Sequence, residues 1–212
     1  TSRCIVATIT VHFLSDLLSD LSLGVIKNYL SMNLENEKLY LNGNRIYLRT
    51  LTEQDATQRY ASWLNDAEVN SFLATKSATV NELQEYIAKK NQQFDAILCG
   101  IFLKDNDLSI GTVKFEPIDL DSRRARIAVM IGDKTFWGQG FAGEAMELLM
   151  KYGFDKLRLT EIDLGVIDKN EAAIRTYHKL GFQEIKRDLK VVEYDGILYD
   201  QVWMEFKCPL VV

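Results

Sequence analysis

The sequence predicts a mixed α/β domain whose central sheet is largely antiparallel. Strand-like and helix-like patterns alternate from about residue 44 onward, which indicates a sheet layered with helices. A short polar turn joins the strand-like segments 96–104 and 109–118, as expected for antiparallel neighbours. Pro117 and Pro209 are the only prolines in the sequence, and no linker or internal repeat is visible. A chain of 212 residues is long enough to bury a proper core.

The first half of this domain is predicted to contain two helices and four strands. Residues 45–51 alternate apolar and polar side chains, as a half-buried strand does. Thr52 and Asp55 have the spacing of a capping box, which predicts a helix beginning at Thr52. A second helix is predicted over about 80–93, where apolar residues follow helical spacing. Three further strands follow this helix, at 96–104, 109–118 and 123–132.

The second half is predicted to alternate helix and strand and to end in a hairpin. The dipeptide Asp195-Gly196 separates the last two strand-like segments and is typical of a hairpin turn. The predicted elements are a helix over about 141–154, a strand at 159–167, a helix at 170–180 and hairpin strands at 182–192 and 196–206.

Residues 1–31 have a different pattern. The apolar run 4–14 is too short to span a membrane, and no small-residue cleavage pattern follows it. Leucines at helical spacing predict an amphipathic helix over 13–30. We therefore expect 1–31 to be an N-terminal extension, helical or outside the natural domain, and 32–212 to form one domain.

Charge and cysteine usage exclude several classes of protein. The net charge is −5 and no block of lysine and arginine occurs, which argues against a nucleic-acid partner. Cys4, Cys99 and Cys208 lie far apart without metal-ligand spacing, and His12 and His178 join no ligand cluster. We therefore expect a cytoplasmic protein with no bound metal and no membrane partner.

The loop WGQGFAGEA, residues 137–145, contains the spacing G-x-G-x-x-G of a dinucleotide-binding turn. In that fold the strand runs directly into the first glycine, whereas GDKTFW separates the predicted strand from Gly138 here. The acidic residue required at the end of the next strand falls inside a strand, at Asp163. The sequence therefore disfavours a nicotinamide cofactor, and no Gly-Lys-Ser/Thr supports a P-loop.

An anion-binding role is still compatible with this loop. Backbone N–H groups of a glycine-containing turn, continued by a helix N-terminus, form a concavity that favours phosphate. Gly138 and Gly140 remove side chains that would block the phosphate. A glycine-rich turn that binds nothing is the alternative interpretation.

A second motif, DKNEAAIRTYHKLGF, lies at residues 168–182. Asn170 is placed to cap the predicted helix, and Gly181 is placed to end it. Taken alone, the segment is a short capped helix in which Tyr177 packs into the core.

Together the two segments resemble the GNAT superfamily of acetyl-CoA-dependent N-acetyltransferases. The family signature is Q/R-x-x-G-x-G/A, followed further along the chain by N-x-x-A-x-x-x-Y-x-x-x-G-F. Gly140 and Ala142 match the first part, and 170–182 matches the second without a gap. Trp137 occupies the Q/R position, as is usual in the ribosomal-protein-alanine acetyltransferase branch, which this chain resembles over about 44–207.

The resemblance implies a GNAT-like sheet that is splayed between its fourth and fifth strands to admit acetyl-CoA as cosubstrate. It implies that backbone N–H groups of 137–142 bind the pyrophosphate and that strand residues 129–131 lie beside the thioester. The implied cofactor-binding residues are Val129, Met130, Ile131, Trp137, Gly138, Gln139, Gly140, Phe141, Ala142, Asn170 and Tyr177.

The resemblance also implies transfer of the acetyl group to a primary amine by direct attack. Tyr177 is the expected acid that protonates the leaving CoA thiolate. Glu116 and Asp133 are the candidate bases, because they are placed near strand ends that face the cleft. A non-catalytic CoA or nucleotide sensor on the same fold is the alternative function. The expected acceptor is a small-molecule or peptide amine, and a homodimer is a candidate assembly because dimers are common among relatives.

Overall fold

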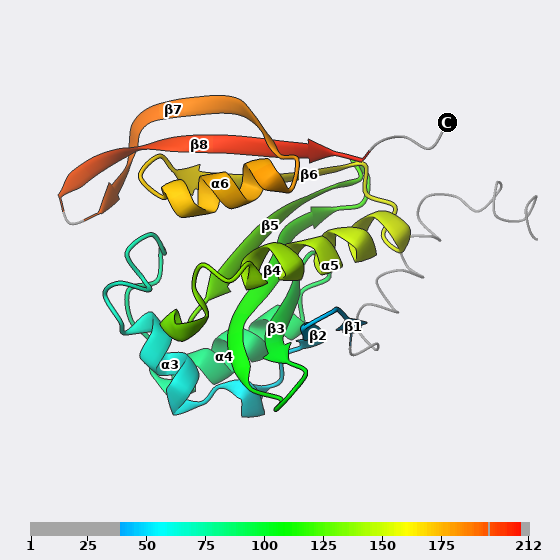
Figure 1. The fold of residues 1–212 in the computed structure, drawn as a ribbon, viewed down its shortest axis with the longest axis vertical. Helices are drawn as coiled ribbons and strands as arrows, with labels where there is room; N and C mark the ends of the chain where they lie inside the picture. Colours follow the sequence, from blue (N-terminus) through cyan, green and yellow to red (C-terminus); the bar gives the residue numbers. More distant parts are fainter. Residues whose placement is uncertain (1–38, 195, 209–212) are drawn as a thin grey trace, which may run out of the picture. The chain divides into compact units, whose positions relative to one another are not determined.

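The computed structural model describes residues 39–194 and 196–208 (Figure 1). These residues belong to the second of the two units into which the chain divides, Lys38–Val212. The predicted helix over 13–30 and the predicted domain boundary at residue 31 lie outside the described residues.

A mixed eight-stranded sheet forms the centre of the described unit, with the strand order β1-β2-β3-β4-β5-β6-β8-β7. Neighbouring strands pair antiparallel except β5 and β6, which are parallel. The predicted fold class is confirmed. The strands are β1 (Tyr40–Asn42), β2 (Ile46–Thr50), β3 (Ile97–Leu103), β4 (Ser109–Asp119), β5 (Arg124–Ile131), β6 (Glu161–Ile167), β7 (Gln183–Tyr194) and β8 (Ile197–Lys207).

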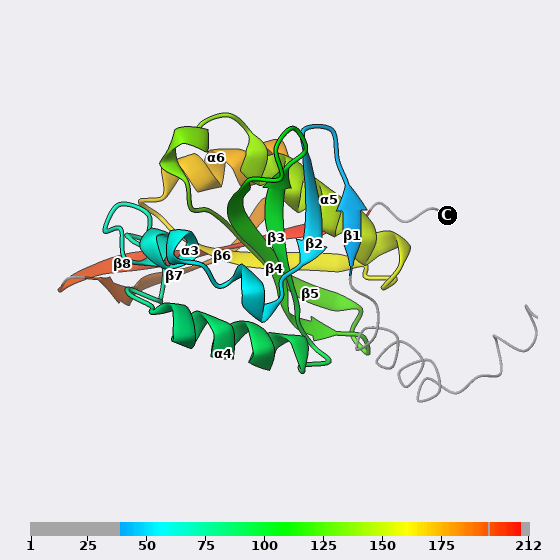
Figure 2. The ribbon, with the colours of Figure 1, turned by 90° about the horizontal axis from the view of Figure 1, so that it is seen from below.

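Helices cover both faces of this sheet (Figure 2). On one face lie α3 (Gln58–Leu64) and α4 (Val80–Asn91), and on the other lie α5 (Phe141–Asp155) and α6 (Glu171–Lys179). Each face has its own buried apolar layer, because the strand residues alternate between the two faces. Phe115 of β4 packs toward α5, while Trp63 and Ile87 belong to the cluster under α3 and α4.

One predicted helix begins later than the sequence indicates. Thr52 and Asp55 form the predicted capping interaction, with the Asp55 carboxylate accepting from the Thr52 backbone N–H at 2.7 Å. The structure that follows is only the 3₁₀ turn η1 (Glu53–Asp55), and α3 starts after Thr57, which caps it. Asp55 also receives two hydrogen bonds from the Arg49 guanidinium, so it is held against β2 rather than continuing a helix.

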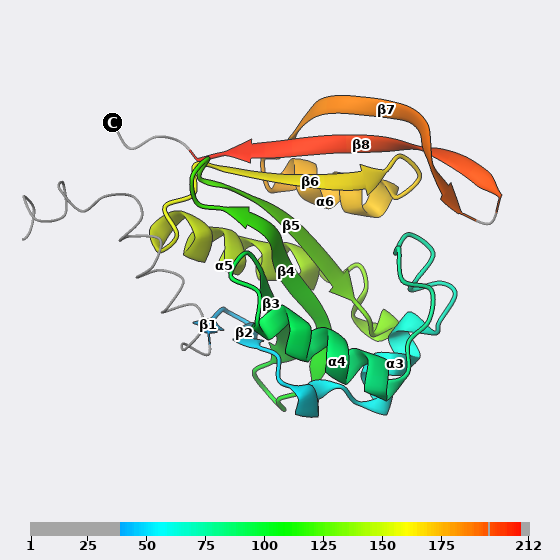
Figure 3. The same ribbon diagram turned by 180° about the vertical axis from the view of Figure 1, so that it is seen from behind.

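The sheet opens between β5 and β6. These two strands pair only at Arg124–Glu161, Ala125–Ile162 and Arg126–Asp163, and then diverge (Figure 3). Because the short strand β1 was not predicted, β5 and β6 are the fourth and fifth of the predicted strands. The predicted splay therefore lies at the predicted place, with residues 127–131 of β5 along its edge.

Candidate active site

The loop from Gly132 to Gly140 connects the end of β5 to the start of α5. Gly138 and Gly140 have φ values of 71° and 81°, a left-handed conformation that costs little only for glycine. Within the described part of the chain, no acceptor receives a hydrogen bond from any backbone N–H between Gly138 and Gly143. These donors, together with the positive end of the α5 dipole, make the loop suited to bind an anion.

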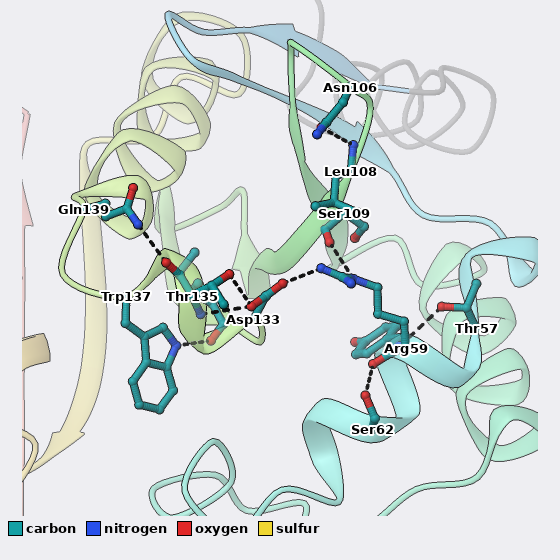
Figure 4. A network of polar contacts seen from close by, with 12 residues as sticks. Thr57, Arg59, Ser62, Asn106, Leu108, Ser109, Asp133, Thr135, Trp137 and Gln139 are labelled. Carbon is teal, nitrogen blue, oxygen red and sulfur yellow. Dashed lines mark hydrogen bonds and ion pairs between the residues drawn. The ribbon is translucent and has the colours of Figure 1, made fainter.

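A network of polar contacts fixes the approach to these donors (Figure 4). The Asp133 carboxylate caps the 3₁₀ turn η2 (Lys134–Phe136) by accepting from the Thr135 backbone N–H at 2.9 Å and its hydroxyl at 2.7 Å. The Gln139 side-chain amide donates to the Thr135 carbonyl at 2.7 Å. The Trp137 indole N–H donates to the Ile131 carbonyl, also at 2.7 Å. The loop is thus preorganised by its own side chains.

Asp133 is also ion-paired with Arg59 of α3. Burial alone would raise the pKa of Asp133, but the Thr135 hydrogen bonds and the Arg59 charge outweigh it and lower the pKa below its usual value. Both carboxylate oxygens therefore have partners, and the group is a weak proton acceptor. Its contacts hold the loop and tie it to α3, and its role as a base stays a prediction from the sequence.

Glu116, the other candidate base, lies away from the loop. Because β4 and β5 are antiparallel, with Gly111 opposite Ile131 and Phe115 opposite Ile127, Glu116 lies toward the other end of β5. Its carboxylate pairs with Lys90 and, at 2.7 Å, with Lys114.

The electrostatic surroundings of Glu116 resemble those of Asp133. Burial acts to raise its pKa, but the hydrogen bonds from Lys114 and Lys90 prevail and lower it. Glu116 is therefore also a weak proton acceptor, and the structure does not bring it together with the other site residues.

The edge strand residues Val129, Met130 and Ile131 are all partly buried. They pair with β4 on one side, opposite Val113, Thr112 and Gly111. On the β6 side they have no strand partner, because that pairing stops at Arg126. An extended ligand can therefore lie along this edge and bond to the main chain.

Tyr177 lies on α6 and Asn170 caps its N-terminus, as the second motif predicts. Tyr177 is buried, and burial raises the pKa of its hydroxyl to about 12. No hydrogen-bond partner for this hydroxyl exists among the described residues. The Asn170 side-chain oxygen caps α6 by accepting from the Ala173 N–H at 3.3 Å, which leaves its amide N–H groups available as donors.

The two motifs meet where α5 and α6 pack together. A Cβ atom added to Gly143 would lie 3.8 Å from Thr176 and 4.0 Å from Leu180, which is ordinary van der Waals contact. Thr176 directly precedes Tyr177, so the start of α5 lies against the helix that carries the predicted acid. The side chain of Phe141 is buried, so this residue can offer a ligand at the loop only its backbone.

Two residues at this site were not predicted from the sequence. Arg45 and Glu144 form an ion pair beside the loop, with 2.9 Å between the Arg45 Nε and the Glu144 Oε2. Arg45 also contacts Gln139, which lies 94 residues further along the chain. A local sequence pattern cannot indicate contacts between residues so far apart.

Within residues 39–194 and 196–208, no cluster of three or more His, Cys, Asp or Glu side chains could hold a metal ion. None of the helices described is long and apolar enough to cross a membrane.

Comparison with known proteins agrees with this geometry. Residues 45–183 match the sequence family described as acetyltransferase (GNAT) domain. The chain is 33% identical over 165 residues to the uncharacterized N-acetyltransferase YoaA of Bacillus subtilis, a match that covers 76% of this chain and 92% of that protein. It is 27% identical over 163 residues to human alpha/beta-tubulin-N-acetyltransferase 9, covering 71% of this chain and 78% of that protein.

The fold has solved counterparts as well. Spermidine N-acetyltransferase from Vibrio cholerae, in complex with CoA and spermine, superimposes with a TM-score of 0.71 at 22% identity. That match covers 77% of this chain and 95% of the other.

A splayed sheet with a glycine loop opening the next helix defines the acyl-CoA-dependent acetyltransferase class of folds. The chain belongs to the GNAT acetyltransferase family, and it is an N-acetyltransferase that uses acetyl-CoA.

Proposed function

We propose that this chain transfers the acetyl group of acetyl-CoA to a primary amine by direct attack, with Tyr177 protonating the leaving thiolate. The observation that carries the proposal is the row of unpaired backbone N–H groups from Gly138 to Gly143, at the start of α5. Neither the loop alone nor the splay alone would suggest a ligand that is both anionic and extended. CoA has both properties.

In this proposal the pyrophosphate binds to the unpaired backbone N–H groups among 137–142. The pantetheine arm follows the open edge of β5 at Val129, Met130 and Ile131, which places the thioester in the splay. Support comes from the missing β6 pairing along that edge. The amide of Asn170 donates to the arm, and the exposed ring of Trp137 covers the cofactor where it leaves the loop.

The chemical step then proceeds in the splay. The amine nitrogen attacks the thioester carbonyl carbon, the C–S bond breaks, and the sulfur leaves with the bonding electron pair. The sulfur takes the proton of the Tyr177 hydroxyl, the new amide nitrogen releases its surplus proton to water, and Tyr177 regains a proton from water. A pKa of about 12 keeps Tyr177 protonated at neutral pH, so that the donor is present when charge develops on sulfur.

We further propose that Glu116 and Asp133 do not act as the general base. Each is ion-paired and each has a lowered pKa, so each is a weaker proton acceptor than an ordinary carboxylate and is already occupied by its cationic partner. The amine reaches the site by losing its proton to solvent. Asp133 contributes by capping η2 and tying the loop to α3.

The acceptor class follows from the chemistry and from the relatives. A small-molecule or peptide amine is proposed, since one relative is named for tubulin and one structure holds spermine. The form Trp137-Gly138-Gln139-Gly140-Phe141-Ala142 resembles the ribosomal-protein-alanine branch, which makes a protein N-terminal amine one candidate. We also propose that the protein acts in the cytoplasm and forms a homodimer.

A thiol-release assay tests this function. Acetyl-CoA is incubated with the protein and with panels of peptides, polyamines and amino sugars, and free CoA and acetylated amine are both measured. We expect CoA and acetylated product to form in equal amounts with at least one amine. CoA binding without any acetylated amine across all panels would support the non-catalytic sensor instead.

A further inference from the structure

Arg45 contacts both the loop and the start of α5. It lies directly before β2, and its guanidinium is placed 4.2 Å above the centre of the Phe141 ring. The Nη1 amino group of the guanidinium donates to the main-chain carbonyl of Gln139 at 2.9 Å. The Nε–H donates to Glu144 at 2.9 Å. A single side chain therefore contacts the loop, the first residue of α5 and the first turn of that helix.

Glu144 fixes this arrangement from the other end. Its Oε1 accepts from the backbone N–H groups of Asn44 at 3.0 Å and Arg45 at 2.8 Å. The carboxylate is therefore held by main chain on one side and by the guanidinium on the other. The side chain of Arg45 thus has a defined position, although it is 45% exposed.

The contact with Gln139 determines where the next N–H points. A trans peptide unit is planar, and its C=O and N–H groups point in opposite directions. The Gln139–Gly140 bond is trans, since the only cis bond in the described residues is Glu116–Pro117. With the Gln139 carbonyl held by Arg45, the Gly140 N–H must point away from the Arg45 guanidinium.

The other loop contacts do not reach the Gln139 carbonyl, which within residues 39–194 and 196–208 accepts a hydrogen bond from Arg45 alone. Gly138 and Gly140 flank the Gln139 residue, and glycine moves between backbone conformations at little cost. A rotation of the peptide plane would turn the carbonyl oxygen toward the anion and remove one donor. A carbonyl oxygen that faces a pyrophosphate also repels it. The rotation would therefore both remove a donor and add a repulsive contact.

We propose that Arg45 is a positioning residue for acetyl-CoA, which holds the Gln139–Gly140 peptide with its N–H toward the pyrophosphate. The proposal rests on the pyrophosphate site proposed above. It predicts an effect confined to ligands that carry the pyrophosphate, because Arg45 has no part in binding the pantetheine arm.

The test compares two ligands across three variants. The dissociation constant of CoA is measured by calorimetry, and that of pantetheine, which lacks phosphates, by ligand-observed NMR. R45Q removes the charge and the Gln139 contact, while R45K keeps the charge and one donor. R49Q is the matched control, because Arg49 lies on β2 close to Arg45 in the sequence, pairs with a carboxylate (Asp55) and lies 4.1 Å from the centre of the Phe102 ring.

We expect R45Q to weaken CoA binding about tenfold, as for loss of a hydrogen bond from a charged donor, while pantetheine binding stays unchanged. R45K should recover part of the loss, and R49Q should bind both ligands as the unaltered protein does. CoA affinity within about twofold of the unaltered protein would overturn the proposal. An equal loss for both ligands would also overturn it, since that result indicates general damage to the fold. If R45Q does not fold, R45K carries the same comparison.

Failure of the underlying site gives a different result. If the unaltered protein binds CoA no more tightly than pantetheine, the loop does not bind the pyrophosphate, and the proposed role of Arg45 fails with it. If CoA binds more tightly and R45Q matches it, only the role of Arg45 fails.

Discussion

The indole N–H of Trp137 donates to the main-chain carbonyl of Ile131 across 2.7 Å. This bond closes the loop on itself, since Ile131 is the last residue of β5 and Trp137 directly precedes the first left-handed glycine. The ring remains 39% exposed. A residue that departs from the broad family signature thus has a clear structural role, because its side chain links the strand edge to the anion-binding turn.

Replacing Trp137 with phenylalanine should therefore loosen the loop. W137F keeps an aromatic ring but loses a hydrogen bond worth about 1 kcal/mol, so the KM for acetyl-CoA should rise about fivefold with little change in kcat. Steady-state kinetics with varied acetyl-CoA measure this. W203F is a suitable control, because the Trp203 indole N–H bonds to Asp188 at 2.9 Å and not to the loop. A similar rise in KM for both variants would refute the role of Trp137.

Substitution of Tyr177 separates binding from chemistry. Y177F keeps the ring packed beside Phe182, 6.1 Å away between ring centres, and removes only the hydroxyl. The kcat should fall by about a hundredfold, a usual loss for a general acid, while the dissociation constant of CoA stays the same. Y199F, which changes a tyrosine near the hairpin turn, serves as a comparison. Unchanged turnover in Y177F would exclude this tyrosine as the proton donor.

Two glycines three positions apart should respond to alanine in opposite ways. G140A should destabilise the protein by about 1–2 kcal/mol, because φ is 81° there and L-residues disfavour that conformation. No atom blocks the new methyl group, whose nearest neighbour is 3.7 Å away, so the cost is conformational. G143A lies in the first helical turn with only ordinary contacts, and it should stabilise by up to about 1 kcal/mol.

Urea unfolding measures both changes, and calorimetry with CoA follows the site. G140A should also weaken CoA binding, whereas G143A should not. Equal destabilisation by both substitutions would show that the loop conformation is not what the glycines provide.

Neutralising the two candidate bases tests the proton path. Loss of a general base costs a factor of about 10² to 10⁴ in rate, whereas E116Q and D133N are each expected to lower kcat by less than about tenfold. The pH dependence of kcat/KM should keep its acid limb in both variants. D133N should raise the KM for acetyl-CoA, because Asp133 caps η2. A kcat reduced beyond about a hundredfold, with the acid limb abolished, would identify the altered residue as the base.

The Glu144 carboxylate should make the free energy of unfolding depend on pH in the acidic range. Burial tends to raise its pKa, but hydrogen bonds from the Arg45 and Ile46 backbone and from the guanidinium lower it below the ordinary value of 4.5. A lowered pKa in the folded state contributes stability above pH 4.5, and that stability is lost as the pH falls through the folded-state pKa.

The corresponding variant is E144Q. It should be less stable than the unaltered protein by about 1 kcal/mol at neutral pH, and the difference should shrink below about pH 4. Urea midpoints across this pH range measure the effect. E147Q changes an exposed carboxylate on the same helix and should show no such difference. If the difference in urea midpoint between E144Q and the unaltered protein stays the same below about pH 4, the stabilising effect does not come from the charge of Glu144.

Most helices and strands could be predicted because their signals are local. The cap at Asn170, the left-handed Gly181 and the turn at Gly196 are all found where the sequence places them. Two predictions differ from the structure, one because an element was missed and one because a predicted helix does not begin at its cap. The strand β1 is only three residues long and is formed by pairing with β2, so it has almost no pattern of its own. The helix predicted at Thr52 has a genuine cap but lacks a continuation, because Arg49 holds Asp55.

The candidate site divides in the same way. Glycines, the helix cap and the tyrosine are spaced by local geometry, and the motifs therefore reveal them. Each of the two candidate bases has one partner from a distant element: Arg59 of α3 pairs with Asp133, and Lys90 of α4 pairs with Glu116. A carboxylate has the same appearance in a sequence whether its neighbours neutralise it or leave it free. For that reason the sequence could predict two candidate bases but not that both carboxylates are ion-paired.

The early end of the β5–β6 pairing at Arg126 has a consequence for how this protein can change over time. In the proposed binding mode the coenzyme bonds to the main chain of residues 127–131, and main-chain groups are the same whichever side chain is attached. The side chains on this edge would then make no specific contact with the coenzyme and could vary with the core and with the acceptor. The same coenzyme could in this way serve many amines, although the strand along which it lies carries no polar motif.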